Sequence, residues 1–228
     1  MKIAAIVQAR TGSARLPGKV LREVAGKPLL LYLVERLQHA TRLDGVIVAT
    51  SVEAGDDALA ELCVAQAIDV HRGPLDDVAR RLLEAAEEGG LDAFVRVSAD
   101  SPLLDQALVD RAVELAHGVD VVTNIFPERT FPHGMSVELL DTQSMRAAVD
   151  AITDPGDREH VTPYLYRHPH RFAIRSFTHD EDLSKLQLTV DTPEDLERFE
   201  AIAGAMTRPH WEYSLDGVIA LVRSLGLT

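Results

Sequence analysis

Short apolar runs alternate along the chain with longer segments whose apolar residues recur every three or four positions. The first pattern predicts buried strands and the second predicts helices packed on one face. The strands predicted in the first half are residues 3–7, 45–50, 69–71, 93–98 and 120–123. The helices predicted between them are residues 28–41, 56–67, 75–88 and 105–117. This alternation favours an α/β fold with a mostly parallel central sheet covered by helices on both faces.

The pattern changes after Asn124, where residues 125–134 form a loop rich in proline and aromatic residues. The later predicted helices are residues 142–152, 159–167, 193–206 and 214–225. Residues 135–140 predict a strand, while 171–177 and 186–190 alternate like exposed or antiparallel strands. No repeat or linker divides the chain. We therefore expect residues 1–228 to form one domain, with residues 125–180 as an antiparallel excursion within it.

Bulk composition predicts an ordinary globular protein, because 46% of the residues are hydrophobic and 26% are charged. No apolar run approaches the roughly 18–20 residues that span a bilayer, so we expect no membrane partner. The N-terminus lacks a signal-peptide pattern. The single cysteine, Cys63, lies beside apolar residues of a predicted helix and cannot form an internal disulfide. The expected compartment is the cytoplasm.

Charge is distributed unevenly along this acidic chain. Its 23 basic and 36 acidic residues give a net charge of −13, which disfavours nucleic acid as a partner. Residues 1–27 nevertheless carry a local charge of +5, and the other 201 residues carry −18. A cationic start on an acidic body suggests that one small part of the protein handles an anion.

The loop after the first predicted strand holds most of the chemistry of that start. Arg10, Arg15 and Lys19 place three cations within ten residues. Between them, Gly12 and Ser13 allow backbone amides to approach a phosphate closely. The loop leaves the carboxyl end of a strand, where open α/β sheets bind ligands. Its glycine spacing matches neither a Walker loop nor the dinucleotide fingerprint, and the alternative interpretation is a solvated basic loop.

Two aspartates are candidates for a metal on a phosphate ligand. Asp100 follows the predicted strand at 93–98, where a carboxylate could hold Mg²⁺ or cap a turn. Asp191 precedes Thr192 and Pro193, which together are typical of a helix start. That start explains Thr192 and Pro193 but leaves Asp191 unexplained.

Taken together, the ordered motifs resemble the sugar cytidylyltransferases, including the enzymes that make CMP-Kdo and CMP-sialic acid. Within them, the chain is most similar to the branch called spore coat polysaccharide biosynthesis protein F. The matching stretches are residues 8–19, 48–51, 72–73 with 77, 78 and 81, 96–102, 131–134 with 137–138, 158–163 and 189–195. They cover nearly the whole chain, and their order is more specific than any single motif.

The resemblance implies a three-layer, Rossmann-like domain of the nucleotide-diphospho-sugar transferase (GT-A-like) type. It implies an enzyme that converts CTP and a sugar into a CMP-sugar and pyrophosphate for surface polysaccharide biosynthesis. We expect that sugar to be acidic. The resemblance also implies a homodimer, and it implies that Asp100 and Asp191 hold Mg²⁺ and act in catalysis with Arg10, Arg15 and Lys19. The implied nucleotide-binding residues are Gln8, Ala9, Arg10, Gly12, Ser13, Arg15, Lys19, Thr50, Ser51, Arg72, Gly73 and Asp77. The implied sugar-binding residues are Asn124, Phe131, His133, Gly134, Glu138, Arg158, Glu159 and His160.

Several alternatives stay open at the level of sequence. Asp77 could equally stabilise the first turn of the helix at 75–88, and Glu159 could simply begin a helix in which His160 packs. A GT-A-type glycosyltransferase could use the same sheet with a nucleotide-sugar donor, although such a donor does not need so cationic a first loop. A non-catalytic nucleotide-binding homologue is the third possibility. The residues alone decide neither the sugar nor the preference for CTP.

Overall fold

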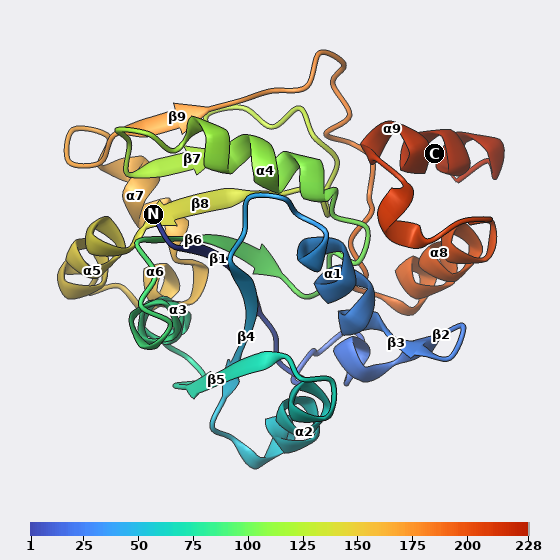
Figure 1. The fold of residues 1–228 in the computed structure, drawn as a ribbon, viewed down its shortest axis with the longest axis horizontal. Helices are drawn as coiled ribbons and strands as arrows, with labels where there is room; N and C mark the ends of the chain where they lie inside the picture. Colours follow the sequence, from blue (N-terminus) through green and yellow to red (C-terminus); the bar gives the residue numbers. More distant parts are fainter. Residues whose placement is uncertain (228) are drawn as a thin grey trace.

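The computed structural model describes residues 1–227, which build a seven-stranded sheet in the order β5-β4-β1-β6-β8-β7-β9 (Figure 1). The strands are β1 Ile3–Gln8, β4 Gly45–Ser51, β5 Asp69–Gly73, β6 Ala93–Ser98, β7 Val121–Thr123, β8 Glu138–Asp141 and β9 Ile174–Ser176. Strand β8 runs antiparallel to both of its neighbours, β6 and β7. The remaining neighbouring pairs of this sheet are parallel. The prediction of an α/β fold with a mostly parallel sheet is confirmed.

Helices cover both faces of the sheet (Figure 1). They are α1 Leu29–Gln38, α2 Asp57–Ala65, α3 Val78–Glu88, α4 Gln106–Leu115, α5 Thr142–Ala151, α6 Pro155–His160, α7 Thr162–Arg167, α8 Pro193–Gly204 and α9 Leu215–Ser224. Alternate residues of β1 enter opposite cores. Ala5 and Val7 pack with α1 and α4, whereas Ala4 and Ile6 pack with α3 and α5. This two-sided burial explains the continuous apolar run of the first strand. Among residues 1–227, no helix combines the length and apolarity that crossing a bilayer requires.

The second half departs from the predicted elements in three places. Strand β9 is parallel to β7, because the chain first passes through α5, α6 and α7 before returning to the sheet edge. Residues 186–190 form no regular strand and make one isolated bridge, between His133 and Gln187. The helix predicted at 159–167 is divided into α6 and α7 at Val161, which has a φ of 70°.

Local chemistry explains that division. The Asp154 side chain accepts from the backbone N–H of Asp157, and Pro155 occupies the first turn, so α6 begins earlier than expected. Pro163 then starts α7 and lacks the N–H that a continuous helix would need. Glu159 therefore lies near the end of α6 rather than at a helix start. The chain also forms a small unpredicted hairpin, β2 Glu23–Val24 with β3 Lys27–Pro28.

Candidate active site

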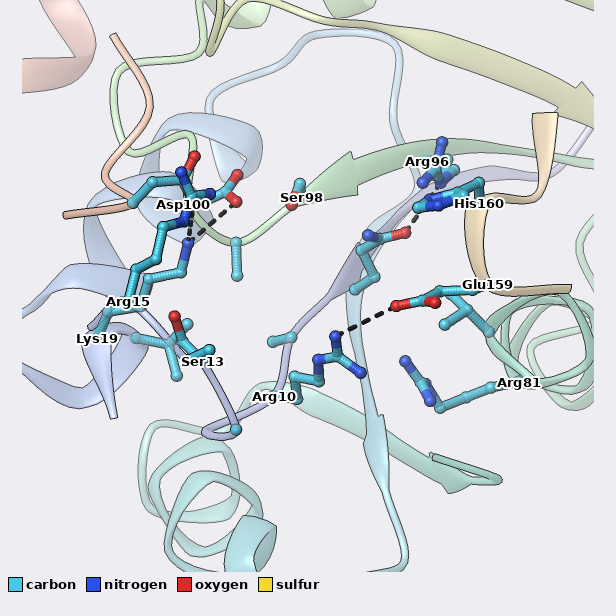
Figure 2. A pocket seen from close by; sticks show the side chains of 18 residues that line it. Arg10, Ser13, Arg15, Lys19, Arg81, Arg96, Ser98, Asp100, Glu159 and His160 are labelled. Carbon is cyan, nitrogen blue, oxygen red and sulfur yellow. Dashed lines mark hydrogen bonds and ion pairs between the residues drawn. The ribbon is translucent and has the colours of Figure 1, made fainter. Parts of the chain in front are cut away.

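A cavity of about 320 Å³ opens at the carboxyl ends of β1 and β6 (Figure 2). Because these strands are parallel neighbours, Gln8 lies beside Ser98 and the residues that follow each strand meet at one edge. The predicted site residues that line the cavity are Gln8, Ala9, Arg10, Gly12, Ser13, Arg15, Lys19, Asp100, Glu159, His160 and Asp191. The cationic loop and both aspartates are therefore brought together from positions far apart in the sequence.

Lys19 joins the two aspartates at one end of this cavity. Its Nζ atom lies 3.1 Å from Oδ2 of Asp100 and 2.8 Å from Oδ1 of Asp191, and it donates to the carbonyl of Val190 at 2.9 Å. The backbone N–H of Val190 in turn donates to the carbonyl of Asp100 at 2.8 Å, which holds the two segments side by side. Lys19 is only 8% exposed, so this ammonium is held by three oxygens with little help from water.

Arg15 adds a second cation at the same end, because its guanidinium lies 3.2 Å from Oδ1 of Asp191. Burial raises the pKa of Asp191, but the hydrogen bond and charge of Lys19, with the charge of Arg15, bring that pKa below its ordinary value. Asp191 is therefore an anion at neutral pH, held between two cations.

Arg10 lies toward the other end of the cavity, where its guanidinium is 3.4 Å from Oε1 of Glu159 on α6 (Figure 2). Nearby, Arg96 of β6 donates to Oε1 of Gln8 at 2.9 Å and to Oε2 of Glu138 at 2.6 Å. The hydroxyl of Tyr166 donates to the same Glu138 carboxylate. Burial and the charge of Glu138 raise the pKa of Tyr166, which therefore stays a neutral donor.

Seven further residues line the cavity that were not predicted as site residues: Ala14, Val20, Val78, Arg81, Arg96, Ser98 and Ala99. The two arginines had a signal in the sequence, since each is a charge placed among buried positions of a strand or helix. Arg81 is 2% exposed and donates to the carbonyls of Pro74 and Leu75. Burial, reinforced by the charge of Arg10, lowers the pKa of Arg81.

The remaining predicted nucleotide-binding residues lie outside the cavity lining. Thr50 and Ser51 are fully buried at the end of β4, and Ser51 donates to Asp56. Arg72 donates to the carbonyls of Ser51 and Glu53 and pairs with Asp57. Gly73 packs against Arg81 and His71. Asp77 accepts from the N–H of Arg80, which caps α3, and it pairs with Arg158.

Most of the predicted sugar-binding residues also lie outside the lining. The Asn124 side chain bonds to the backbone of Met135 and Val137, and Phe131 is buried against Phe177. Gly134 contacts the backbone of Leu188 and Thr189, while His133 is exposed. Glu138 and Arg158 are engaged in the ion pairs described above. Glu159 and His160 line the cavity, and the roles of the whole group stay predictions.

The two aspartates suit a hard cation. Both present carboxylate oxygens to one common nitrogen, and Mg²⁺ usually takes one or two carboxylates and completes its shell with waters and phosphates. Across residues 1–227 there is no group of three or more His, Cys, Asp or Glu side chains that could hold a metal. The remaining oxygens of a site built on the two aspartates would come from waters and from a phosphate-bearing ligand.

Comparisons with known proteins concern the family and the fold of the chain. The model of the cytidylyltransferase family matches residues 4–213. The chain is 32% identical to the spore coat polysaccharide biosynthesis protein SpsF of Bacillus subtilis, over 86% of this chain and 84% of that relative.

The solved structures that are similar to this one include two nucleotide-transferring enzymes. A cytidylyltransferase from Leptospira borgpetersenii serovar Hardjo-bovis has a TM-score of 0.93 and 31% identity, covering 100% of this chain and 96% of that chain. A CMP:2-keto-3-deoxy-manno-octonic acid synthetase complexed with CTP has a TM-score of 0.69 and 18% identity, and the match covers 90% of this chain and 99% of that chain. The second likeness concerns the fold alone.

Proposed function

The chain is an enzyme of the cytidylyltransferase family, and we propose that it transfers a cytidylyl group from CTP to a sugar and releases pyrophosphate. The observation that carries the proposal is the contact of Lys19 with both Asp100 and Asp191 inside a cavity that Arg10 and Arg15 also line. These three loop cations and two aspartates, which line the cavity together, suit a metal-bound triphosphate.

In the proposed reaction, a sugar hydroxyl attacks the α-phosphorus of CTP. A new P–O bond to the sugar forms, the bond to the β-phosphate oxygen breaks, and pyrophosphate leaves. Arg10, Arg15 and Lys19 would hold the triphosphate and stabilise the charge that develops on the leaving group. Such chemistry depends on positioning and charge stabilisation, so it requires no covalent protein nucleophile. The proton of the attacking hydroxyl passes to a carboxylate of the acidic sugar or to water.

Asp100 and Asp191 would hold Mg²⁺. When bound, the ion would screen the charge of the triphosphate and polarise its phosphoryl oxygens. Both carboxylates are occupied by Lys19 in this structure, so the side chain of Lys19 would turn from the carboxylates toward phosphate oxygens. Its flexible stem allows that movement.

The choice of substrates is supported by similar proteins. The solved synthetase of like fold is complexed with CTP and makes the CMP derivative of an acidic sugar, and the Bacillus subtilis relative is named for polysaccharide biosynthesis. We extend CTP, an acidic sugar and a role in surface polysaccharide biosynthesis to this chain on that basis. Glu159 and His160 of α6, with the segment from Asn124 to Glu138, are the proposed sugar-binding region. Homodimerisation and a cytoplasmic location stay predictions.

The decisive experiment measures pyrophosphate release with a panel of nucleoside triphosphates, Mg²⁺ and a panel of sugar acids. We expect release that depends on both CTP and one sugar. Asp100→Asn and Asp191→Asn should each lower kcat by about a hundredfold or more, since each removes a carboxylate that would hold Mg²⁺ on the triphosphate. Asp150→Asn, an exposed change on α5, is the matched control and should keep full activity.

Equal activity with all four triphosphates and no dependence on sugar would contradict the proposal. Turnover of a nucleotide-sugar donor without pyrophosphate release would instead identify a glycosyltransferase.

A further inference from the structure

Thr11 ties together the two ends of the cationic loop, although its own side chain lies outside the cavity lining. Its carbonyl accepts the backbone N–H groups of Ser13 and Gly18, each at 2.9 Å. One carbonyl therefore closes the loop that carries Arg15 and precedes Lys19. Any shift of Thr11 moves both ends of this loop together.

Thr11 is held in turn by Asp56, which precedes α2. Oδ1 of Asp56 accepts the backbone N–H and the hydroxyl of Thr11, both at 2.7 Å. The other oxygen, Oδ2, accepts the backbone N–H of Ser51 at 3.3 Å and the Ser51 hydroxyl. A single carboxylate thus joins the end of β4 to the start of the loop after β1.

Asp56 is buried, and its carboxylate bonds to Thr11 and Ser51 rather than to its own helix. It is 3% exposed, and a buried carboxylate is tolerated only when donors surround it. Although it stands at the N-cap of α2, its side chain makes no capping bond to that helix. Its acceptor oxygens serve Thr11 and Ser51 instead.

We propose that Asp56 is a positioning residue for triphosphate binding, which acts by holding Thr11 and, through it, the backbone of the loop from Thr11 to Lys19. This inference rests on the proposed function, because it takes that loop to bind phosphate. It also gives Ser51 an indirect part in nucleotide binding: its hydroxyl and N–H orient the carboxylate that orients the loop.

A positioning role and a merely structural role differ in what they do to different ligands. A misplaced loop weakens the binding of phosphates but leaves the binding of a nucleoside without phosphates unchanged. A general loss of stability would alter both ligands alike or alter only the melting temperature. Comparing CTP and pyrophosphate with cytidine therefore separates the two roles.

The test measures the dissociation constants of CTP, pyrophosphate and cytidine for the full chain by calorimetry. We expect Asp56→Asn to weaken the binding of CTP and of pyrophosphate by about tenfold or more, without changing the affinity for cytidine. A tenfold loss is about the scale of one hydrogen bond to a charged group. Thr11→Val keeps the backbone N–H, so it should weaken the binding of the same two ligands by a smaller factor. Asp57→Asn changes the neighbouring exposed carboxylate, which pairs with Arg72, and should change none of the three.

Unchanged CTP and pyrophosphate affinities in both Asp56→Asn and Thr11→Val would overturn the inference, as would an equal loss of cytidine. Should Asp56→Asn fail to fold, Thr11→Val and Ser51→Ala decide, and normal phosphate affinity in both would overturn it. Wild-type protein that binds pyrophosphate but not CTP would contradict only the proposed nucleotide, and the pyrophosphate series would then decide the role of Asp56. Wild-type protein that binds neither would contradict both proposals.

Discussion

Lys19 and Lys2 lie in the same cationic segment of the chain, yet their surroundings differ completely. Lys19 is buried between Asp100 and Asp191, whereas the ammonium of Lys2 donates to the carbonyl of Gly89 at an exposed position. Removing Lys19 would leave Asp100 without its cation and Asp191 with Arg15 alone, which is costly in a partly buried site. The difference arises from depth in the fold, because both residues carry the same charge.

Gly134 is a second residue whose surroundings matter, because they leave no room for a larger side chain at this position. Its φ is +93°, and a Cβ atom there would lie 2.8 Å from the carbonyl carbon of Leu188 and 2.9 Å from the N atom of Thr189. These are backbone atoms, two to three residues before Asp191. We therefore expect Gly134→Ala to displace the segment that carries Asp191.

This variant should lose about 1–3 kcal/mol of folding free energy from backbone strain and, in addition, about tenfold or more in kcat. Gly118→Ala is the matched control, since Gly118 has a φ of +73° with no neighbouring atom within 4 Å of its Cβ position. Chemical denaturation and steady-state kinetics measure the two effects. Equal kinetics in both variants would show that Asp191 does not depend on this contact.

At the scale of elements, the N-terminus of α3 joins three segments of the structure. Asp77 accepts from the N–H of Arg80 at 2.9 Å, and its other oxygen lies 2.5 Å from the guanidinium of Arg158 on α6. Arg158 also donates to the carbonyl of Ile152. Of the two roles that the sequence left open for Asp77, the structure shows helix capping; Asp77 lies outside the cavity lining, and its contact with a nucleotide stays a prediction.

Two substitutions of Asp77 separate the contribution of the helix cap to stability from that of the ion pair with Arg158. Asp77→Ala removes the cap and the ion pair and should cost about 1–2 kcal/mol of folding free energy. Asp77→Ser keeps a capping oxygen, so it should lose only the ion pair, about 0.2–1 kcal/mol. Denaturant unfolding checks both values, and CTP affinity should be unchanged in Asp77→Ser. A large loss of CTP affinity in that variant would instead indicate a direct role at the nucleotide.

Over the whole molecule, Arg36 attaches the C-terminal segment to the body of the fold. Its side chain is fully buried on α1 and donates to the carbonyls of Leu104, His210 and Tyr213. Burial lowers the pKa of Arg36 to about 10, so it remains a cation at neutral pH. In Figure 1, α8 lies beside α1, and α9 lies next to α8.

His210 makes this attachment sensitive to pH. Burial lowers its pKa, and the neighbouring charges of Lys27 and Arg36 add to that effect, while the bond from its Nε2 atom to Glu35 opposes it. The unfolded chain takes up a proton on this residue below about pH 6.5, where the native state does not. Stability contributed by neutral His210 is therefore present above that pH and falls as the pH drops toward the lowered native pKa.

We expect the melting temperature of the wild-type protein to fall between pH 7.5 and 5.5, and we expect His210→Gln to reduce the slope of that fall. His117→Gln, at an exposed position, should keep the wild-type slope. A differential scanning calorimetry series measures all three. Parallel slopes in wild type and His210→Gln would assign the acid sensitivity to other groups.

The sequence alone determined the fold class and the family, because burial on both faces of a strand leaves a continuous apolar run and the motifs occur in a fixed order. Both predictions are confirmed. It also made the cationic loop a candidate, because its cations follow a buried strand, and Asp191, because the helix start at Thr192 left that carboxylate unexplained. Asp100 stayed open between a metal ligand and a turn cap, and the resemblance favoured the ligand. The sequence did not reveal Arg81 and Arg96 as cavity residues or the break of the helix at Val161.

Only the tertiary structure decided which polar residues meet. Asp100 and Asp191 are brought to one ammonium by a backbone hydrogen bond between Val190 and Asp100. Asp56, which follows β4, accepts from Thr11, which follows the neighbouring strand β1. Thr50 and Arg72 lie near the carboxyl ends of β4 and β5, and Asp77 follows β5, yet none of them lines the cavity. The local pattern of apolar and polar residues shows which positions are buried and whether a segment is helix or strand. The direction of a side chain at a strand end depends instead on loops whose contacts are distant in the sequence.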